Sequence, residues 1–105
     1  HPQSRRVMSA EYVALLRKML CLVVEEGTAQ DAAWLDEGAG GKTGSAQTGQ
    51  FTPDGTERKN LWFAGFYPAQ QPRYTIVGLQ DGQVSTEHSS AAIFARLCAM
   101  LDLLA

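Results

Sequence analysis

Two segments with helical apolar periodicity enclose three strand-like segments, and this order limits the possible folds more than any other feature. Ser9 suits the N-cap of the first helix, and Gly27 suits the left-handed stop that ends it. The predicted apolar stripe of this helix comprises Tyr12, Leu15, Leu16, Met19 and Val23. The last helix is predicted from Glu87 or Ser89 to Leu104. Its predicted apolar face comprises Ile93, Leu97, Met100, Leu101 and Leu104.

The strand-like segments lie at 41–47, 61–68 and 73–80. A polar stretch, 48–60, separates the first two, and its Pro53-Asp54-Gly55 turn signal predicts a long hairpin loop. Asp81-Gly82 predicts a further turn after the third. Because short links favour antiparallel pairing, the sequence predicts an α+β fold with the order helix, three antiparallel strands, helix.

The second strand, 61–68, is apolar at alternate positions on both of its faces. A strand with this pattern is covered on both sides of its sheet, and two helices supply little cover for three strands. We therefore expect the chain, residues 1–105, to be a single but incomplete unit of a larger domain.

The composition excludes several classes of partner. The 105 residues carry a formal net charge of -2, which gives no electrostatic reason to expect nucleic acid or an anionic membrane. No apolar run approaches the roughly 18 residues of a membrane helix, so no membrane segment is expected. For Cys21 and Cys98, free buried thiols are the favoured interpretation and a disulfide is the alternative. No Cys and His cluster has metal-ligand spacing, so neither a metal nor a cofactor is expected.

The first strand, Gly41-Lys42-Thr43-Gly44-Ser45-Ala46-Gln47, combines a cation, two hydroxyls and a glycine. The Lys42 ammonium and the hydroxyls of Thr43 and Ser45 suit a carboxylate ligand. Gly44 lets a ligand lie close to the backbone, and the Ser45 amide can stabilise an oxyanion. The alternative is a solvated edge strand protected by a lysine. Strict alternation places Lys42 and Thr43 on opposite faces, so both reach one ligand only along the strand edge.

A second interpretation of the same stretch is a phosphate-binding loop, because Gly38-Ala39-Gly40-Gly41-Lys42-Thr43 is similar to the end of a Walker A sequence. That pattern requires glycine where this chain has Asp36, and a helix directly after the lysine. The residues that follow, 45–50, have poor helix signals. The sequence therefore disfavours nucleotide binding.

The ordered set of motifs resembles the carboxy-terminal part of the transpeptidase domain of penicillin-binding proteins, especially the class B, monofunctional type. The resemblance covers nearly the whole chain, and the order of its pieces is more specific than any one of them. The pieces are Val23-Val24-Glu25-Glu26-Gly27-Thr28-Ala29, the Lys42-Thr43-Gly44 strand, Trp62-Phe63-Ala64-Gly65-Phe66-Tyr67-Pro68, Tyr74-Thr75-Ile76-Val77 and Ala91-Ala92-Ile93-Phe94. The fold implied is that of penicillin-binding proteins and serine β-lactamases, a mainly antiparallel five-stranded sheet between helices.

The resemblance also implies roles for individual residues. Lys42 is expected to aid proton transfer and carboxylate binding, and Thr43 and Ser45 to contact the carboxylate. The Ser45 amide is expected to join the oxyanion hole, with Gly44 and Gln47 in the substrate-binding strand. The implied partners are D-Ala-D-Ala stem peptides of peptidoglycan and β-lactams. The implied location is the outer face of the cytoplasmic membrane. Serine at position 45 departs mildly from the more usual threonine and keeps the hydroxyl.

Two other motifs of that family are missing from this chain. No serine has a lysine three residues later. The only asparagine in the sequence is Asn60, and the position two residues before it, where Ser-x-Asn requires serine, is Arg58. Since nucleophilic catalysis needs an activated serine, we predict a fragment that is inactive alone. The alternatives are a fragment of a serine β-lactamase or β-lactam sensor, and a non-catalytic interaction module. The fragment hypothesis predicts exposed apolar surface and possible self-association.

Overall fold

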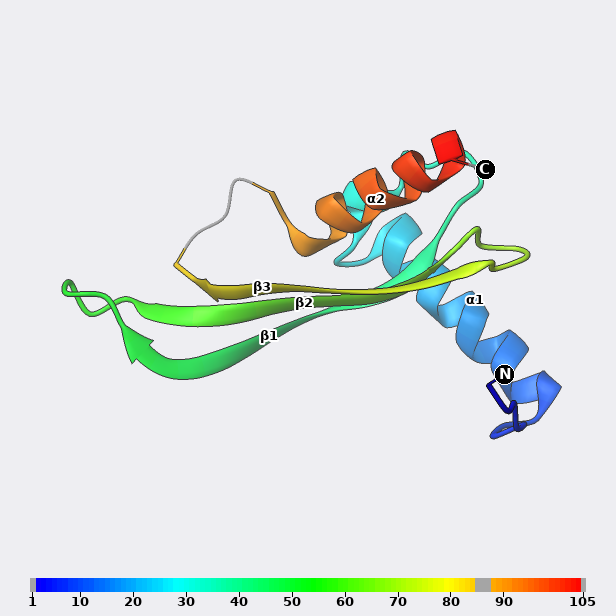
Figure 1. Cartoon of the computed structure of the whole chain (residues 1–105), viewed down its shortest axis with the longest axis horizontal. Helices are drawn as coiled ribbons and strands as arrows, with labels where there is room; N and C mark the ends of the chain where they lie inside the picture. Colours follow the sequence, from blue (N-terminus) through cyan, green and yellow to red (C-terminus); the bar gives the residue numbers. More distant parts are fainter. Residues whose placement is uncertain (1, 85–87, 105) are drawn as a thin grey trace.

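The computed structural model describes residues 2–84 and 88–104, and these form two helices and a three-stranded sheet (Figure 1). The elements are α1 (Ala10–Glu26), a short 3-10 helix η1 (Gln30–Ala32), β1 (Gly40–Phe51), β2 (Glu57–Tyr67), β3 (Tyr74–Gln83) and α2 (Ser90–Leu104). The strands are antiparallel, and β2 lies between β1 and β3. The predicted α+β order of helix, three antiparallel strands and helix is confirmed.

The helix α1 has the predicted ends but not the predicted buried stripe. Ser9 caps it, because the Tyr12 amide donates to Ser9 Oγ at 3.3 Å. Gly27 ends it, as predicted, and its amide donates to the Val23 carbonyl at 3.0 Å. The left-handed conformation predicted for Gly27 is wrong, because its φ is -105°. Val24 is its one buried residue. Of the predicted stripe, Val23 is partly buried against the core, and the other four residues are exposed, namely Tyr12, Leu15, Leu16 and Met19.

Ser89 caps the start of the helix α2, because its Oγ accepts from the Ala92 amide at 3.0 Å. The alternative start at Glu87 lies outside the described residues. The predicted apolar face is wrong as the buried face, since Leu97 is 41% and Leu104 83% exposed. The buried residues are Ala91, Phe94, Ala95 and Cys98. The side chains on this face are mostly small, which lets α2 approach the connector, the segment 27–39 between α1 and β1. Ala29 and Ala32 of the connector are also fully buried.

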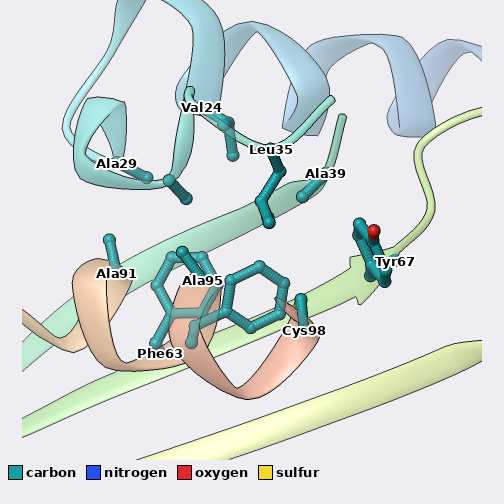
Figure 2. Close-up of a cluster of buried hydrophobic side chains, with 11 residues drawn as sticks. Val24, Ala29, Leu35, Ala39, Phe63, Tyr67, Ala91, Ala95 and Cys98 are labelled. Atoms are coloured by element: carbon teal, nitrogen blue, oxygen red, sulfur yellow. The ribbon is translucent and has the colours of Figure 1, made fainter. Parts of the chain in front are cut away.

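The core lies between one face of the sheet and the two helices (Figure 2). Phe63 of β2 is 1% exposed, and its ring centroid lies 4.5 Å from that of Phe94 in α2. Tyr67, four residues further along β2 and on the same face, is equally buried. Its hydroxyl donates to Asp102 Oδ2 at 2.5 Å, which fastens the end of β2 to the last turn of α2. Burial, and then the Asp102 carboxylate, raise the pKa of Tyr67 above its ordinary range.

The opposite face of the sheet is largely uncovered by the residues that the structure describes. Register and alternation place Trp62, Phe66, Val77 and Leu79 on that face. Val77 is 62% exposed and Leu79 47% exposed. The prediction that β2 is covered on both faces therefore holds for the face of Phe63 alone within this chain.

The turn predicted at Pro53-Asp54-Gly55 is confirmed, but the predicted length of the loop, 48–60, is wrong, because β1 continues to Phe51 and β2 begins at Glu57. Thr48 Oγ1 donates to the Arg58 carbonyl at 2.5 Å, and the Gly49 amide donates to Glu57 Oε2 at 3.0 Å. These cross-strand bonds satisfy polar groups that the sequence pattern assigned to a loop. The resulting hairpin projects beyond both helices (Figure 1).

The turn predicted at Asp81-Gly82 is also wrong, since both residues lie inside β3. Gly82 has φ +60° there, and pairing with β2 shifts register nearby. Its amide donates to Asn60 Oδ1 at 2.9 Å, and its carbonyl accepts from Arg58 Nη1 at 3.2 Å. Two side chains of β2 thus hold an irregularity that the local sequence identifies as a turn.

Cys98 is a buried free thiol, as favoured from the sequence, whereas the free thiol of Cys21 is half-buried. Neither α1 nor α2, the long helices of the described part, is long and apolar enough to cross a bilayer.

Candidate functional site

The polar strand predicted as a site forms the first half of β1, which lies at an edge of the sheet. Gly40 and Gly41 are buried where β1 crosses the rings of β2. A Cβ at Gly40 would lie 2.2 Å from Phe66 Cζ, and one at Gly41 would lie 2.6 Å from Phe63 Cζ. Only glycine permits this close approach. The strand then emerges from the core, so the residues that follow are accessible along its free edge.

Lys42 is exposed, and its side chain bends over the edge of β1. Its Nζ donates to the Thr43 carbonyl at 3.1 Å and lies 3.4 Å from Thr43 Oγ1. Alternation does place the two side chains on opposite faces of the sheet, as predicted. The length of the lysine side chain nevertheless brings its ammonium to the Thr43 hydroxyl. The cation and the hydroxyl therefore meet at the strand edge, where one anionic ligand can contact both.

Thr28 is a residue of this site that the sequence analysis did not identify. Its Oγ1 lies 3.1 Å from Thr43 Oγ1, although the two residues are fifteen positions apart in the chain. Thr28 follows the helix stop at Gly27, and a threonine in that place has no local signal for a site. Only its position within the family-like segment that ends the first helix could have drawn attention to it.

Ser45 and Gln47 lie on the same face of β1 as Thr43 and are exposed. The contact from Lys42 indicates that the Thr43 carbonyl points away from β2. In an antiparallel pair, amides and carbonyls two residues apart point the same way, so the Ser45 amide points to the free edge as well. Gly44 lies between them, and a Cβ there would meet no atom closer than Trp62 Cβ at 3.8 Å. The strand thus presents a cation, two hydroxyls and an outward amide along one edge.

Two other kinds of site lack support. The chain continues after Lys42 as a strand rather than a helix, so the backbone amides of a phosphate loop are not present there. Among residues 2–84 and 88–104, no three His, Cys, Asp or Glu side chains are grouped so that they could hold a metal ion. The arrangement is instead suited to a carboxylate-bearing ligand laid along β1.

Comparisons with known proteins identify the family and the fold of this chain. The family model for the penicillin binding protein transpeptidase domain matches residues 1–99. The chain is also similar to the crystal structure of penicillin binding protein 3 from Mycobacterium tuberculosis complexed with ampicillin, with 29% sequence identity and a TM-score of 0.75. That match covers 99% of this chain and 26% of the other, so this chain spans about a quarter of the relative's length. No curated protein sequence matches.

Proposed function

This chain belongs to the penicillin-binding protein transpeptidase family, and we propose that it is the carboxy-terminal part of a DD-transpeptidase domain of the class B type. The parent protein cross-links peptidoglycan peptides at the outer face of the cytoplasmic membrane. A serine outside residues 1–105 supplies the nucleophile, and this segment alone is inactive. The absence of Ser-x-x-Lys and Ser-x-Asn patterns from the sequence supports this division.

The observation that carries the proposal is the convergence of Lys42 and Thr43 at the free edge of β1, with their functional atoms 3.4 Å apart. In the proposed reaction, the serine oxygen attacks the carbonyl carbon of a D-Ala-D-Ala terminus or a β-lactam. The amide C–N bond breaks, and the nitrogen takes up the proton that the serine loses. Lys42 supplies a positive field for this proton transfer and for the ligand carboxylate.

The neighbouring residues complete the ligand contacts in the proposed complex. Thr43 and Ser45 donate hydroxyl hydrogen bonds to the carboxylate. The Ser45 amide donates to the oxyanion that develops on the attacked carbonyl. Gly44 lets the ligand lie close to the backbone, and Gln47 contacts the ligand further along the strand. The exposure of Gly44, Ser45 and Gln47 on the edge strand, next to the half-buried Thr43, supports these roles.

The test is acylation of the full-length protein that carries this segment. Lys42→Ala is expected to slow acylation by benzylpenicillin at least a hundredfold, because a preorganised charge at the reacting centre is lost. Lys18→Ala is the matched control, since Lys18 is exposed on α1 and lies outside the β1 strand. Acylation is measured by stopped-flow fluorescence and intact mass. An unchanged rate in Lys42→Ala would remove the role given to Lys42. Rapid hydrolysis of the adduct would favour a β-lactamase instead.

We also propose that the isolated segment self-associates through the uncovered face of its sheet. In the parent protein, other elements of the domain cover the side chains of Trp62, Val77 and Leu79. The exposure of these side chains supports this assignment, because soluble proteins seldom leave a contiguous apolar face in water.

A further inference from the structure

Thr28 is held in place by the end of α1. The amides of Gly27 and Ala29, one on each side of it, both donate to the Val23 carbonyl, at 3.0 and 3.2 Å. Ala29 is itself fully buried in the core. The Thr28 backbone is therefore fixed between two anchored neighbours, while its side chain remains exposed beside β1.

Three polar groups are in successive contact at this point. Lys42 Nζ lies 3.4 Å from Thr43 Oγ1, and Thr43 Oγ1 lies 3.1 Å from Thr28 Oγ1. A hydroxyl has one proton and two acceptor lone pairs, whereas an ammonium group only donates. Lys42 therefore occupies one lone pair of the Thr43 oxygen. The direction of the bond between the two threonines decides what Thr43 has left to offer a ligand.

The two directions differ in their effect on a carboxylate. If Thr43 donated to Thr28, it would present only a lone pair to the negatively charged ligand, and the two would repel. If Thr28 donates to Thr43, both lone pairs of Thr43 are occupied and its proton is free. That proton can then form a charge-assisted hydrogen bond to the carboxylate. A bound anion favours the second direction.

We propose that Thr28 is a positioning residue that donates to Thr43 Oγ1 and so directs the Thr43 proton to the carboxylate of the peptide or β-lactam. This inference rests on the proposed function of the β1 edge. In this proposal Thr28, which lies outside β1, makes Thr43 the hydrogen-bond donor to the carboxylate.

The test compares full-length Thr28→Val and Thr28→Ser with the wild type. Two probes are used, benzylpenicillin and its methyl ester, which lacks the carboxylate charge. Thr28→Val is expected to slow acylation by the free acid about tenfold, as for one hydrogen bond to a charged group, and acylation by the ester less than about twofold. Thr28→Ser restores the rate with the acid. Thr56→Val, at an exposed threonine in the turn between β1 and β2, is the matched control and leaves both rates unchanged.

A double substitution tests whether Thr28 acts through Thr43. Thr43→Val is expected to abolish the effect of Thr28→Val, because the hydroxyl that Thr28 orients is gone. Thermal melting checks that each variant folds, and Thr28→Ala replaces Thr28→Val if the valine is not tolerated.

Three results would overturn the inference. Equal loss with the acid and the ester would indicate a structural role for Thr28. Additive losses in the double variant would indicate a separate contact, and an unchanged rate with the acid would leave Thr28 without a role. These outcomes leave the proposed function intact, provided that the wild type is acylated and that acylation of Lys42→Ala is slowed as expected. A wild type that penicillin does not acylate would overturn both.

Discussion

The two faces of the sheet differ in how far this chain completes them. On the face of Phe63 and Tyr67, the core is closed by the strands, the connector and both helices. The side chains of Phe63 and Tyr67 are almost wholly buried there. On the face of Trp62 and Val77, which the same strands provide, large apolar side chains remain open to solvent. One β-strand, β2, thus supplies alternate residues to a finished core and to an unfinished one.

The difference separates stability from assembly. Residues on the closed face hold the segment together, and residues on the open face are available to other elements of the domain. Lys42 extends from the open face over the strand edge, whereas Thr43 and Thr28 lie on the closed side. The candidate site therefore lies at the border of the two faces, so it needs both the segment's own core and the elements proposed to cover the other face.

The largest expected effect compares neighbouring aromatic residues of β2. In the isolated segment, Phe63→Ala is expected to lower the free energy of unfolding by about 3–5 kcal/mol, because it removes a fully buried ring and leaves a cavity. Trp62→Ala, at a side chain 41% exposed on the other face, is expected to cost only about 1 kcal/mol. Urea unfolding followed by circular dichroism measures both values.

The same pair of residues separates stability from self-association. Trp62→Glu is expected to shift sedimentation-velocity profiles towards the monomer, since a charge on the open face opposes association. A wild-type segment that remains a monomer at high concentration would contradict the proposed self-association. A Trp62→Ala loss as large as that of Phe63→Ala would contradict the distinction between the faces.

A smaller effect is expected along β1, whose first residues are buried and whose later residues are exposed. A Cβ at Gly41 would lie 2.6 Å from Phe63 Cζ and 2.7 Å from the Ala64 carbonyl oxygen, so Gly41→Ala is expected to cost about 1–3 kcal/mol. Gly44→Ala meets nothing closer than 3.8 Å and is expected to change the free energy of unfolding by less than about 0.5 kcal/mol. Thermal or urea unfolding of the two variants decides the matter, and equal losses would contradict it.

The same two glycines also bear on the proposed site. In the full-length protein, Gly44→Ala is expected to slow acylation by penicillin although it folds normally, because its methyl group stands beside Lys42 on the same face of β1 and narrows the space for a ligand. Normal acylation of Gly44→Ala would argue against a ligand laid close to this part of β1.

The sequence was sufficient to predict the order of the elements, which follows largely from local periodicity and turn signals. It was also sufficient to place Lys42, Thr43 and Ser45 on one strand, which follows from their motif. It was insufficient for the buried face of α2. There the larger side chains, such as Leu97, suggested the wrong face, since the closest packing is made by small residues such as Ala95. Size indicates the buried face only when a helix has one partner, and α2 has a second apolar face that this chain leaves open.

Tertiary contacts explain the other differences. The contact of Thr28 with Thr43 depends on how the connector returns the chain to β1, which no local pattern specifies. The polar residues of the hairpin were interpreted as a loop because their partners, as in the bond from Gly49 to Glu57, lie across the strands. Asp81-Gly82 has turn composition, yet Asn60 binds the Gly82 amide and keeps it within β3.

The smallest expected effect concerns a titratable group on the closed face. Burial raises the pKa of Cys98 from 9.0 to about 11, with the Asp102 carboxylate as a further cause. Below pH 9 the thiol is protonated in both the folded and the unfolded chain, so its contribution to stability is fully present. As pH rises from 9 towards 11, the unfolded chain ionises first and the free energy of unfolding falls.

Cys98→Ala is therefore expected to reduce the fall in the free energy of unfolding between pH 9 and pH 10 by about 1 kcal/mol or less. Tyr67, whose pKa is also raised, contributes mainly above its ordinary value of 10.0, so this interval favours the thiol. Cys21→Ala is the matched control, because its half-buried side chain on α1 is expected to change the slope less. Urea unfolding with a reductant present, repeated across this interval, gives the slopes. Equal slopes for the wild type and Cys98→Ala would mean that water reaches Cys98 and that this face is less closed than its packing indicates.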